Sequence, residues 1–447
     1  MTGWNRTRTI AVVGTMTLVV AGVLGATAVS SGAPAGRLQR GAQGTLRAAA
    51  VKVDITPQDS QWLNGYGARQ STGVLDPIFH RVLALEAGGA AFYLIASDLC
   101  LFSPTVFDNV TAELQKETGI NPKHVLWSVT HTHAAPEIGP PEIYKTLLGR
   151  SDHEWSREYT ARTTRALIDG VKAARTALEP ALISFGTGVS MANINRRARD
   201  VDGRVSIGLN PEGPVDRTFN LIRLIRPDGT PIALVTNYAM HGTVMNGQNL
   251  QISGDGPGVV SAYLEEQLGG TVLYVNGAAG DTAPIYSVYP NARAGHLSQF
   301  RVLLGDRVLA TVKGMAPGTG DVQIDHGERI VETPRKPELD WPAEMAAYTT
   351  TGDRPLVRLP IRFVKINDTA IWAAPVEMFS EVAMNARQQS PFAYTMYFGY
   401  TNGWMGYLPT AKGFEEGGYE PRTSPFTPAV EADVSQAVTA FLQGWRR

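Results

Sequence analysis

The chain has 447 residues, of which 43% are hydrophobic and 18% are charged, and its formal net charge is -1. A chain of this length can form one large domain or two to three average ones, each with a sizeable core. The balanced charge without a basic stripe argues against nucleic acid as a partner, and the single cysteine, Cys100, excludes an intramolecular disulfide.

The N-terminal segment differs from the rest of the chain. Arg6 and Arg8 precede an apolar or small-residue run that extends from Ile10 to about Ala28, and small-x-small sequences follow. This layout is typical of a secretory signal peptide over residues 1–35, and the run is also long enough for an uncleaved membrane anchor. We therefore expect a secreted or extracytoplasmic protein, with peripheral membrane contact as a further expectation.

The next segment, residues 36–47, is rich in Gly, Arg and Gln and is predicted to be a flexible linker. Residues 48–447 are predicted to form the catalytic domain. It alternates strand-like and helix-like segments, which indicates an α/β fold with mixed β-sheets and flanking helices. Strands are expected near residues 49–55, 80–85, 92–101, 127–135, 181–186, 219–224, 231–238, 271–275, 370–375 and 394–400, and helices near 103–118, 154–177, 259–268, 297–312, from 380 and over 428–445.

Two histidines stand near the end of the strand expected at residues 127–135. His131 and His133 are two positions apart, so the alternation of a strand predicts that they face the same side. One could ligate a metal ion while the other handles protons. A His-x-His pair on an exposed strand end is also common as mere surface, so further ligands must be found elsewhere.

Two more strand ends carry potential ligands, namely His241 and Glu377. In α/β sheets, binding sites gather at the carboxyl ends of strands. Two histidines and one carboxylate form a zinc set that leaves a position open for water, and a nearby arginine or tyrosine could stabilise an oxyanion. The pair Arg196-Arg197 is by itself typical of a solvated face or a salt bridge. A serine hydrolase is less favoured, because no Gly-x-Ser-x-Gly sequence is present.

Several short motifs, in order and separation, resemble one family. They are Asp54-Ile55-Thr56-Pro57, Gly65-Tyr66, Thr130-His131-Thr132-His133, Asn193-Ile194-Asn195-Arg196, Met240-His241, Gly280-Asp281 with Pro284, Pro375-Val376-Glu377 and the segment from Tyr407 to Tyr419. The chain is similar over residues 49–425 to the catalytic domain of the neutral, non-lysosomal ceramidases, which are zinc amidases that cleave the N-acyl bond of ceramide.

The resemblance implies roles for individual residues. One zinc ion per chain would be bound by His131, His241, Glu377 and Tyr407. His133 would be the acid/base histidine, and Arg196 and Tyr419 would hold the substrate carbonyl or its developing oxyanion. Arg197 does not align with a functional position, so its interpretation as a solvated or salt-bridged residue stands.

Two departures from the family pattern matter. Ala283 stands where the ceramidases have a serine, so a serine nucleophile at this position is excluded, whereas attack by metal-activated water is not. Thr282 is one position away and would face the other side of an extended segment. The chain also ends too soon after Tyr419 for the separate C-terminal β-sandwich domain of the ceramidases, so it is similar to shorter, single-domain bacterial members.

Taken together, the sequence predicts an exported zinc-dependent amidohydrolase that acts on a small-molecule or lipid amide such as ceramide. One alternative keeps the zinc but has another small amide or an ester as substrate. A second alternative is a catalytically inactive surface binding protein of the same fold. The oligomeric state does not follow from the sequence.

Overall fold

A computed structural model describes residues 36–140, 142–150, 153–288 and 296–446. Contacts group Gly36–Arg447 into one compact unit. The expected signal peptide or anchor, residues 1–35, lies outside the described residues. Among the described helices, none combines the length and the apolar character needed to cross a membrane.

The strands account for most of the regular structure. They are β1 (Arg37–Gln39), β2 (Gly44–Thr45), β3 (Arg47–Asp54), β4 (Gly73–Val74), β5 (Phe79–Ala87), β6 (Ala90–Ser97), β7 (Val125–Val129), β8 (Glu179–Pro180), β9 (Leu182–Val189), β10 (Asn193–Arg199), β11 (Val205–Asn210), β12 (Thr218–Ile225), β13 (Pro231–Tyr238), β14 (Gln251–Ile252), β15 (Thr271–Asn276), β16 (Thr282–Pro284), β17 (Asp321–Val322), β18 (Ile324–Pro334), β19 (Leu356–Ile366), β20 (Thr369–Ala373), β21 (Glu377–Met378), β22 (Tyr394–Phe398) and β23 (Tyr407–Leu408).

The helices flank these strands. They are α1 (Pro104–Thr118), α2 (Glu142–Leu148), α3 (Arg157–Thr176), α4 (Asp255–Leu268), α5 (Asp306–Gly314), α6 (Ser380–Gln388), α7 (Ala411–Glu416), α8 (Tyr419–Arg422) and α9 (Val430–Arg446), with 3-10 turns at η1 (Pro122–His124) and η3 (Ala343–Tyr348) and a π-helical turn at η2 (Arg301–Gly305).

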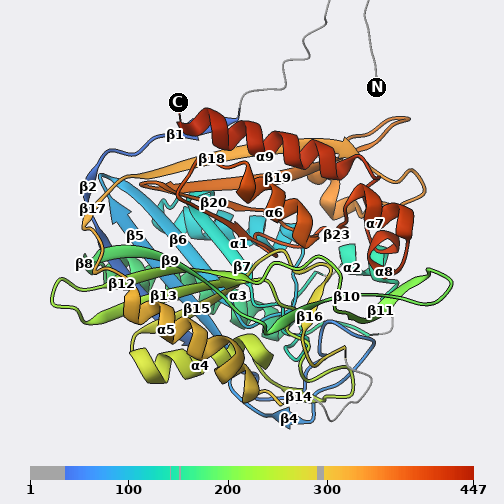
Figure 1. The fold of residues 1–447 in the computed structure, drawn as a ribbon, viewed down its shortest axis with the longest axis horizontal. Helices are drawn as coiled ribbons and strands as arrows, with labels where there is room; N and C mark the ends of the chain where they lie inside the picture. Colours follow the sequence, from blue (N-terminus) through green and yellow to red (C-terminus); the bar gives the residue numbers. More distant parts are fainter. Residues whose placement is uncertain (1–35, 141, 151–152, 289–295, 447) are drawn as a thin grey trace, which may run out of the picture. The chain divides into compact units, whose positions relative to one another are not determined.

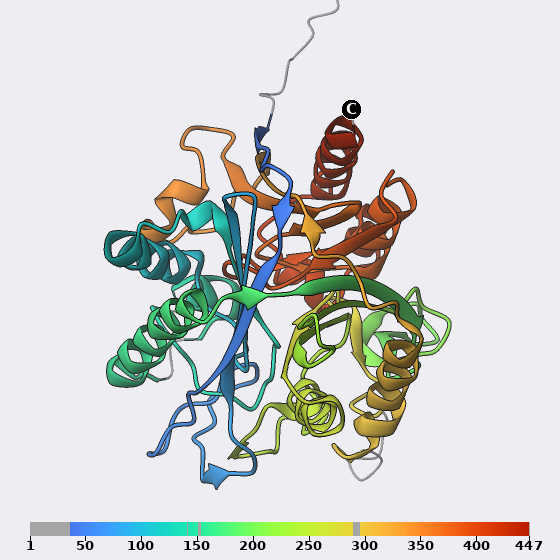
Figure 2. The same cartoon turned by 90° about the vertical axis from the view of Figure 1, so that its left-hand side faces the viewer.

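Three large sheets build the core. Their strand orders are β7-β6-β5-β3-β8, β15-β13-β12-β9 and β1-β18-β19-β20-β22. Apolar residues from all three sheets meet in one buried cluster that includes Leu83, Val235 and Ile371. Helices α3, α4 and α9 pack on β5, β15 and β18, one helix for each sheet, and Figures 1 and 2 show them on the outer side. The predicted α/β class with mixed sheets is confirmed.

Three of the parallel strand pairs share one design. Helix α1 connects β6 to β7, α4 lies between β13 and β15, and α6 connects β20 to β22, and each of these strand pairs is parallel. The carboxyl ends of two parallel strands point the same way, so the chain needs such a crossover to connect them. The segments that follow β7, β13 and β20 contain His131, His133, His241 and Glu377.

A tight hairpin turn lies at Gly88-Gly89. It joins β5 to β6, and both glycines have positive φ, 55° and 79°. Two successive residues with positive φ are what a tight hairpin turn of this hand requires.

The expectation of a flexible linker over residues 36–47 was wrong. Strand β1 pairs antiparallel with β18, and β2 pairs antiparallel with β17. Between them, the Gly41 backbone N–H donates to the buried Asp325 carboxylate at 2.9 Å. Composition alone missed these strands because their stabilising partners lie about 280 residues further along the chain.

Candidate metal centre

The two histidines after β7 reach the same site by a route other than strand alternation. Strand β7 ends at Val129, and His131 has a positive φ of 61°. A turn therefore lies between the strand and the histidines, and their Nε2 atoms are nevertheless 3.2 Å apart. The predicted convergence of His131 and His133 holds, but the reason given for it was wrong.

This turn is locked to the loop that carries His241. The Gly242 N–H donates to the His131 carbonyl at 3.2 Å, and the His133 N–H donates to the Gly242 carbonyl at 2.8 Å. A Cβ atom at position 242 would lie 2.6 Å from the His131 carbonyl oxygen, so only glycine allows this approach. These contacts stabilise the positive φ of His131.

Glu377 and Tyr407 are brought side by side by strand pairing. Strands β21 and β23 are parallel, with Glu377 directly opposite Tyr407. The loop after β15 packs closely behind them, because the Gly280 N–H donates to the Met378 carbonyl at 2.8 Å. The small residues of that loop therefore allow a close approach to the Glu377 backbone.

Three ligand atoms converge at the centre of the site. Glu377 Oε2 lies 3.4 Å from His131 Nε2 and 3.1 Å from His241 Nε2, and all three side chains are buried. The Nδ1 atoms of His131 and His241 each lie 3.0 Å from a backbone carbonyl, of Cys100 and of Thr282. A carbonyl can only accept, so both Nδ1 atoms carry protons, and in the neutral rings both Nε2 atoms present lone pairs.

This arrangement of acceptor groups could hold a metal ion. Two imidazole lone pairs and a carboxylate oxygen are all acceptors, and they face one another within a space of 4.8 Å in a buried site. Burial opposes the charges of His131 and Glu377, yet their mutual attraction raises the pKa of His131 to about 10 and holds that of Glu377 well below its ordinary value. A proton on His131 therefore competes with a metal ion for this space, and the three residues fit a metal ion.

Cys100 forms a second possible ligand group with His131 and His133. Its sulfur lies 3.8 Å from His131 Nδ1, which is the ring nitrogen that already donates to the Cys100 carbonyl. The His131-His241-Glu377 group leaves that hydrogen bond intact and is the better candidate. Cys100 is buried.

Two aromatic residues that the sequence analysis missed hold Glu377. Trp404 donates its indole N–H to Glu377 Oε1 at 2.9 Å, and the Tyr400 hydroxyl donates to Oε2 at 3.3 Å. The Tyr400 ring also stacks on His131, with a centroid distance of 4.2 Å. Neither residue has the type or spacing of a metal ligand. Their only local signal in the sequence is that both lie in the aromatic segment around Gly403.

Arg196 lies at the other side of the ligand group, on β10. Its terminal nitrogens donate to His241 Nε2 at 2.9 Å and to the Tyr407 hydroxyl at 3.1 Å, while its Nε donates to Glu420 at 3.0 Å. Burial and Glu377 hold the pKa of Tyr407 well above its ordinary value, so its hydroxyl is protonated here. Tyr419 lies next to Tyr407, with ring centroids 5.6 Å apart.

Arg197 is not the solvated residue that its type suggested. It is 5% exposed, and it donates to Glu420 at 2.6 Å and to the Gly417 carbonyl at 2.8 Å. The salt-bridge half of the expectation is right and the solvated half is wrong. Glu420 therefore neutralises two adjacent buried arginines, a role that no local pattern indicates.

His133 is held from three directions. Its backbone carbonyl accepts from Arg69 at 2.7 Å, and its ring lies edge-on to Tyr66 with a centroid distance of 4.8 Å. A Cβ atom at Gly65 would lie 2.3 Å from the ring, so the loop that contains Gly65 packs directly against His133. Burial and the neighbouring histidines hold the pKa of His133 well below its ordinary value, so the ring is neutral at pH 7.

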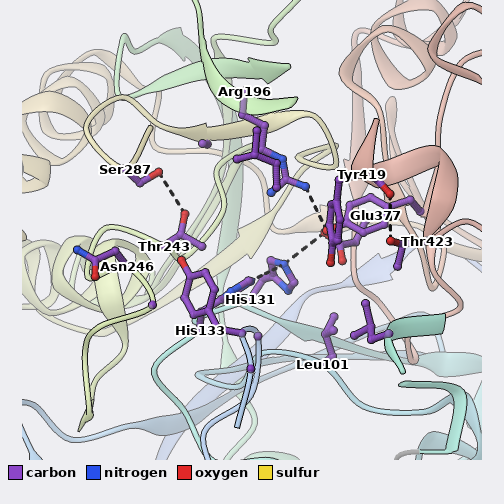
Figure 3. A pocket seen from close by; sticks show the side chains of 18 of the residues that line it. Leu101, His131, His133, Arg196, Thr243, Asn246, Ser287, Glu377, Tyr419 and Thr423 are labelled. Atoms are coloured by element: carbon purple, nitrogen blue, oxygen red, sulfur yellow. Dashed lines mark hydrogen bonds and ion pairs between the residues drawn. The ribbon is translucent and has the colours of Figure 1, made fainter. Parts of the chain in front are cut away.

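All seven predicted site residues lie at one pocket of about 700 Å³, whose lining includes six of them, with His241 just behind its wall. Figure 3 shows the histidines at its centre, Thr243, Asn246 and Ser287 on one side, and Leu101 on the other. Ala283 lines the pocket. The Thr282 hydroxyl instead lies 2.9 Å from that of Ser380, so Thr282 does not take the place of the missing serine.

This set of buried histidines, carboxylate, tyrosine and arginine on an α/β scaffold defines a candidate hydrolytic metal centre. Residues 49–298 match the family described as neutral/alkaline non-lysosomal ceramidase, N-terminal. The chain belongs to this family. His131, His133, Arg196 and His241 lie within the matched residues, whereas Glu377, Tyr407 and Tyr419 lie beyond them.

Curated relatives agree with this assignment. The chain is 28% identical to neutral ceramidase B of Dictyostelium discoideum, over 48% of this chain and 29% of the relative. It is 29% identical to a neutral ceramidase of Mycobacterium tuberculosis, over 49% and 35% of the two chains. The matched segment thus spans about a third of these relatives. The fold is similar to the crystal structure of neutral ceramidase from Pseudomonas aeruginosa, with a TM-score of 0.73, 17% identity, and coverage of 90% of this chain and 75% of that one.

Proposed function

We propose that the protein is an exported zinc-dependent amidohydrolase that cleaves the N-acyl amide bond of ceramide or a similar lipid amide. One observation carries the proposal. His131, His241 and Glu377 direct three acceptor atoms at one point of a pocket, beside a neutral histidine and a buried arginine. Family membership and relatives named neutral ceramidases support the choice of substrate class.

In the proposed reaction, each group of site residues has a separate role. His131, His241, Glu377 and Tyr407 would hold the zinc, which polarises a carbonyl and lowers the pKa of a bound water toward neutrality. His133 is neutral, so it can accept a proton from the attacking water and return it to the leaving amine. Arg196 and Tyr419 carry N–H and O–H donors beside this group, where they can stabilise the developing oxyanion.

The test measures zinc content and hydrolysis of a fluorescent N-acyl sphingosine by the full chain, with an ester of the same acyl group as a comparison. We expect about one zinc per chain, as in other catalytic sites with three to four protein ligands. Glu377→Gln should lose both zinc and turnover. His133→Ala should keep zinc and lose turnover by roughly 100-fold to 10,000-fold, the usual contribution of a general acid/base.

Glu415→Gln is the matched control, because Glu415 is exposed and lies outside the pocket. It should retain both zinc and activity. Absence of zinc from the wild-type protein after metal-replete purification would contradict the proposal, and so would a His133→Ala protein with unchanged turnover. Turnover of the ester alone would replace the amide by an ester substrate.

A further inference from the structure

The charges that line the pocket are unequal. Among the described residues, its lining includes three arginines, Arg150, Arg196 and Arg422, and one acidic residue, Glu377. Glu377 belongs to the candidate metal centre, and Arg196 is paired with Glu420 behind the pocket wall. Within the described residues, Arg150 and Arg422 are therefore the arginines of the lining that no carboxylate neutralises.

Both arginines contact neutral partners. Arg150 is half-buried, and it donates to the Asn64 side chain at 2.7 Å and to the Tyr66 carbonyl. Arg422 donates from Nε to the Gly418 carbonyl at 3.1 Å. Within the described part of the chain, no carboxylate lies within ion-pair distance of either residue. Each guanidinium has five N–H donors in a planar fork that suits a carboxylate or a phosphate, so donors remain for a ligand.

The two segments that carry these arginines meet beside the reacting groups. Leu147, at the end of α2, and Thr423, just after α8, both approach Gly406, where a Cβ atom would lie 2.9 Å from Leu147 Cδ1 and 3.0 Å from the Thr423 carbonyl oxygen. Arg150 follows this end of α2 and holds the loop that packs on His133. Arg422 lies one helical turn after Tyr419 in α8.

We infer that the pocket selects acyl amides whose amine portion carries an anionic group, a carboxylate or a phosphate, which pairs with Arg150 and Arg422. The inference rests on the proposed function and narrows it, because it selects anionic lipid amides rather than ceramide itself as the substrate class of the same site. A charged amine portion would receive charge-assisted hydrogen bonds from these side chains, whereas a neutral one forms no ion pair with either guanidinium group. The apolar residues Leu101 and Leu148 of the same pocket remain for the acyl chain.

The test compares matched amides with the zinc-loaded full chain. N-dodecanoylglycine is paired with neutral N-dodecanoylglycinamide, and N-dodecanoyl-phosphoethanolamine with neutral N-dodecanoylethanolamine. We expect kcat/KM to favour the anionic member of at least one pair by roughly tenfold, mainly through KM, since one well-placed charged hydrogen bond has about this effect. The pair with the larger preference identifies carboxylate or phosphate. The preference should shrink as salt rises.

Arginine variants distinguish recognition of the anionic group from support of the Tyr66 loop. Arg150→Gln and Arg422→Gln should each reduce the preference for the anionic amide, while Arg354→Gln, an exposed arginine outside the pocket, should leave it unchanged. Equal kcat/KM within both pairs would overturn the inference. So would an Arg150→Gln protein that is slowed equally on charged and neutral amides, because that result assigns Arg150 to support of the Tyr66 loop.

A binding measurement keeps the inference separate from the proposed function. The zinc-loaded His133→Ala protein is titrated with N-dodecanoylglycine and with its neutral amide. Tighter binding of the anionic compound, lost in the additional Arg150→Gln variant, supports the inference even if no amide is hydrolysed. Failure of hydrolysis alone would reject the proposed function, and equal binding of the two compounds would reject the inference.

Discussion

At the scale of single residues, Glu420 decides how Arg196 is presented to the pocket. It is 1% exposed, and its two oxygens accept from Arg196 Nε at 3.0 Å and from Arg197 at 2.6 Å. A buried charge is tolerated only when it is paired and hydrogen-bonded. Because Glu420 holds Arg196 at its Nε atom, the two terminal nitrogens of Arg196 are directed at His241 and Tyr407.

The substitution Glu420→Gln tests this role. It leaves two buried guanidinium groups without their shared counter-ion, so we expect a loss of about 3 kcal/mol in the free energy of unfolding, measured by urea denaturation. Glu416→Gln is the control. Glu416 also pairs with Arg197, but its other partners, Arg199 and Lys412, are exposed, so the loss there should be below about 1 kcal/mol. Equal losses in the two variants would contradict the bridging role of Glu420.

At the scale of elements, close backbone contacts set the position of the ligand strand β21. A Cβ atom at Gly280 would lie 2.5 Å from the Glu377 carbonyl oxygen and 2.9 Å from that of Met378. Neither carbonyl can rotate away as a side chain could. The loop after β15 can therefore approach strand β21 this closely only because residue 280 has no side chain.

We expect Gly280→Ala to push Glu377 away from His131 and His241. The free energy of unfolding should fall by about 1–3 kcal/mol, as for other overpacked sites, and zinc affinity in a competition titration should fall with it. Gly444→Ala, in helix α9 with open space around its Cβ, should be neutral or slightly stabilising. Wild-type zinc affinity in the Gly280→Ala protein would show that the strand tolerates displacement.

The element pair β5 and α3 contains a buried histidine that makes stability depend on pH. His80 Nε2 lies 3.0 Å from the Thr163 carbonyl, so Nε2 carries the proton, and Nδ1 lies 2.6 Å from the Ser97 hydroxyl. Ser97 in turn accepts from the Trp127 indole at 2.8 Å. Burial lowers the pKa of His80 to about 4 from the ordinary value of 6.5.

The unfolded chain therefore binds a proton at His80 at a higher pH than the folded protein does. His80 favours the folded state above about pH 6.5, and this contribution is lost as the pH falls toward 4, at about 1.4 kcal/mol per pH unit and about 3 kcal/mol in total. The measurement is the free energy of unfolding of wild type and His80→Gln between pH 7 and pH 4. The difference in the free energy of unfolding between wild type and His80→Gln should shrink by about 3 kcal/mol between pH 7 and pH 4. A difference that stays constant would contradict the low pKa of His80.

At the scale of the whole chain, the N-terminal strands connect distant parts of the fold. Strand β1 adds to the edge of the sheet formed by β18, β19, β20 and β22, while β2 pairs with β17. Asp325 accepts from the Gly41 N–H and also pairs with Lys365 at 2.8 Å. Residues 36–45 are thus part of the folded unit.

We expect a chain that lacks residues 1–45 to be less stable than one that lacks residues 1–35. The loss should reach at least about 1 kcal/mol, because the buried Asp325 carboxylate would lose a backbone donor and β18 would lose its edge partner. Thermal unfolding of the two shortened chains measures it. Identical transitions would restore the interpretation of these residues as a linker.

The sequence alone determined part of the order of the elements, since helices α1, α3, α4 and α9 and strands β5, β6, β12, β13 and β15 follow local periodicity and turn residues, whereas β10, β11, β18 and β19 were not expected. It also indicated His131, His133, His241 and Glu377, because ligand-type residues at strand ends are visible one segment at a time. The positions of Arg196, Tyr407 and Tyr419 came from resemblance, because no local pattern distinguishes them from other arginines and tyrosines.

Only the tertiary structure decided how these residues work together. The parallel pairing of β21 with β23 sets Tyr407 beside Glu377, and Trp404, Tyr400 and Glu420 acquire their roles through contacts that span 23 to 224 residues of sequence. The positive φ at His131 and the burial of Arg197 also depend on distant partners. Propensity and periodicity are properties of neighbours along the chain, whereas hydrogen bonds and desolvation depend on what the folded chain brings together.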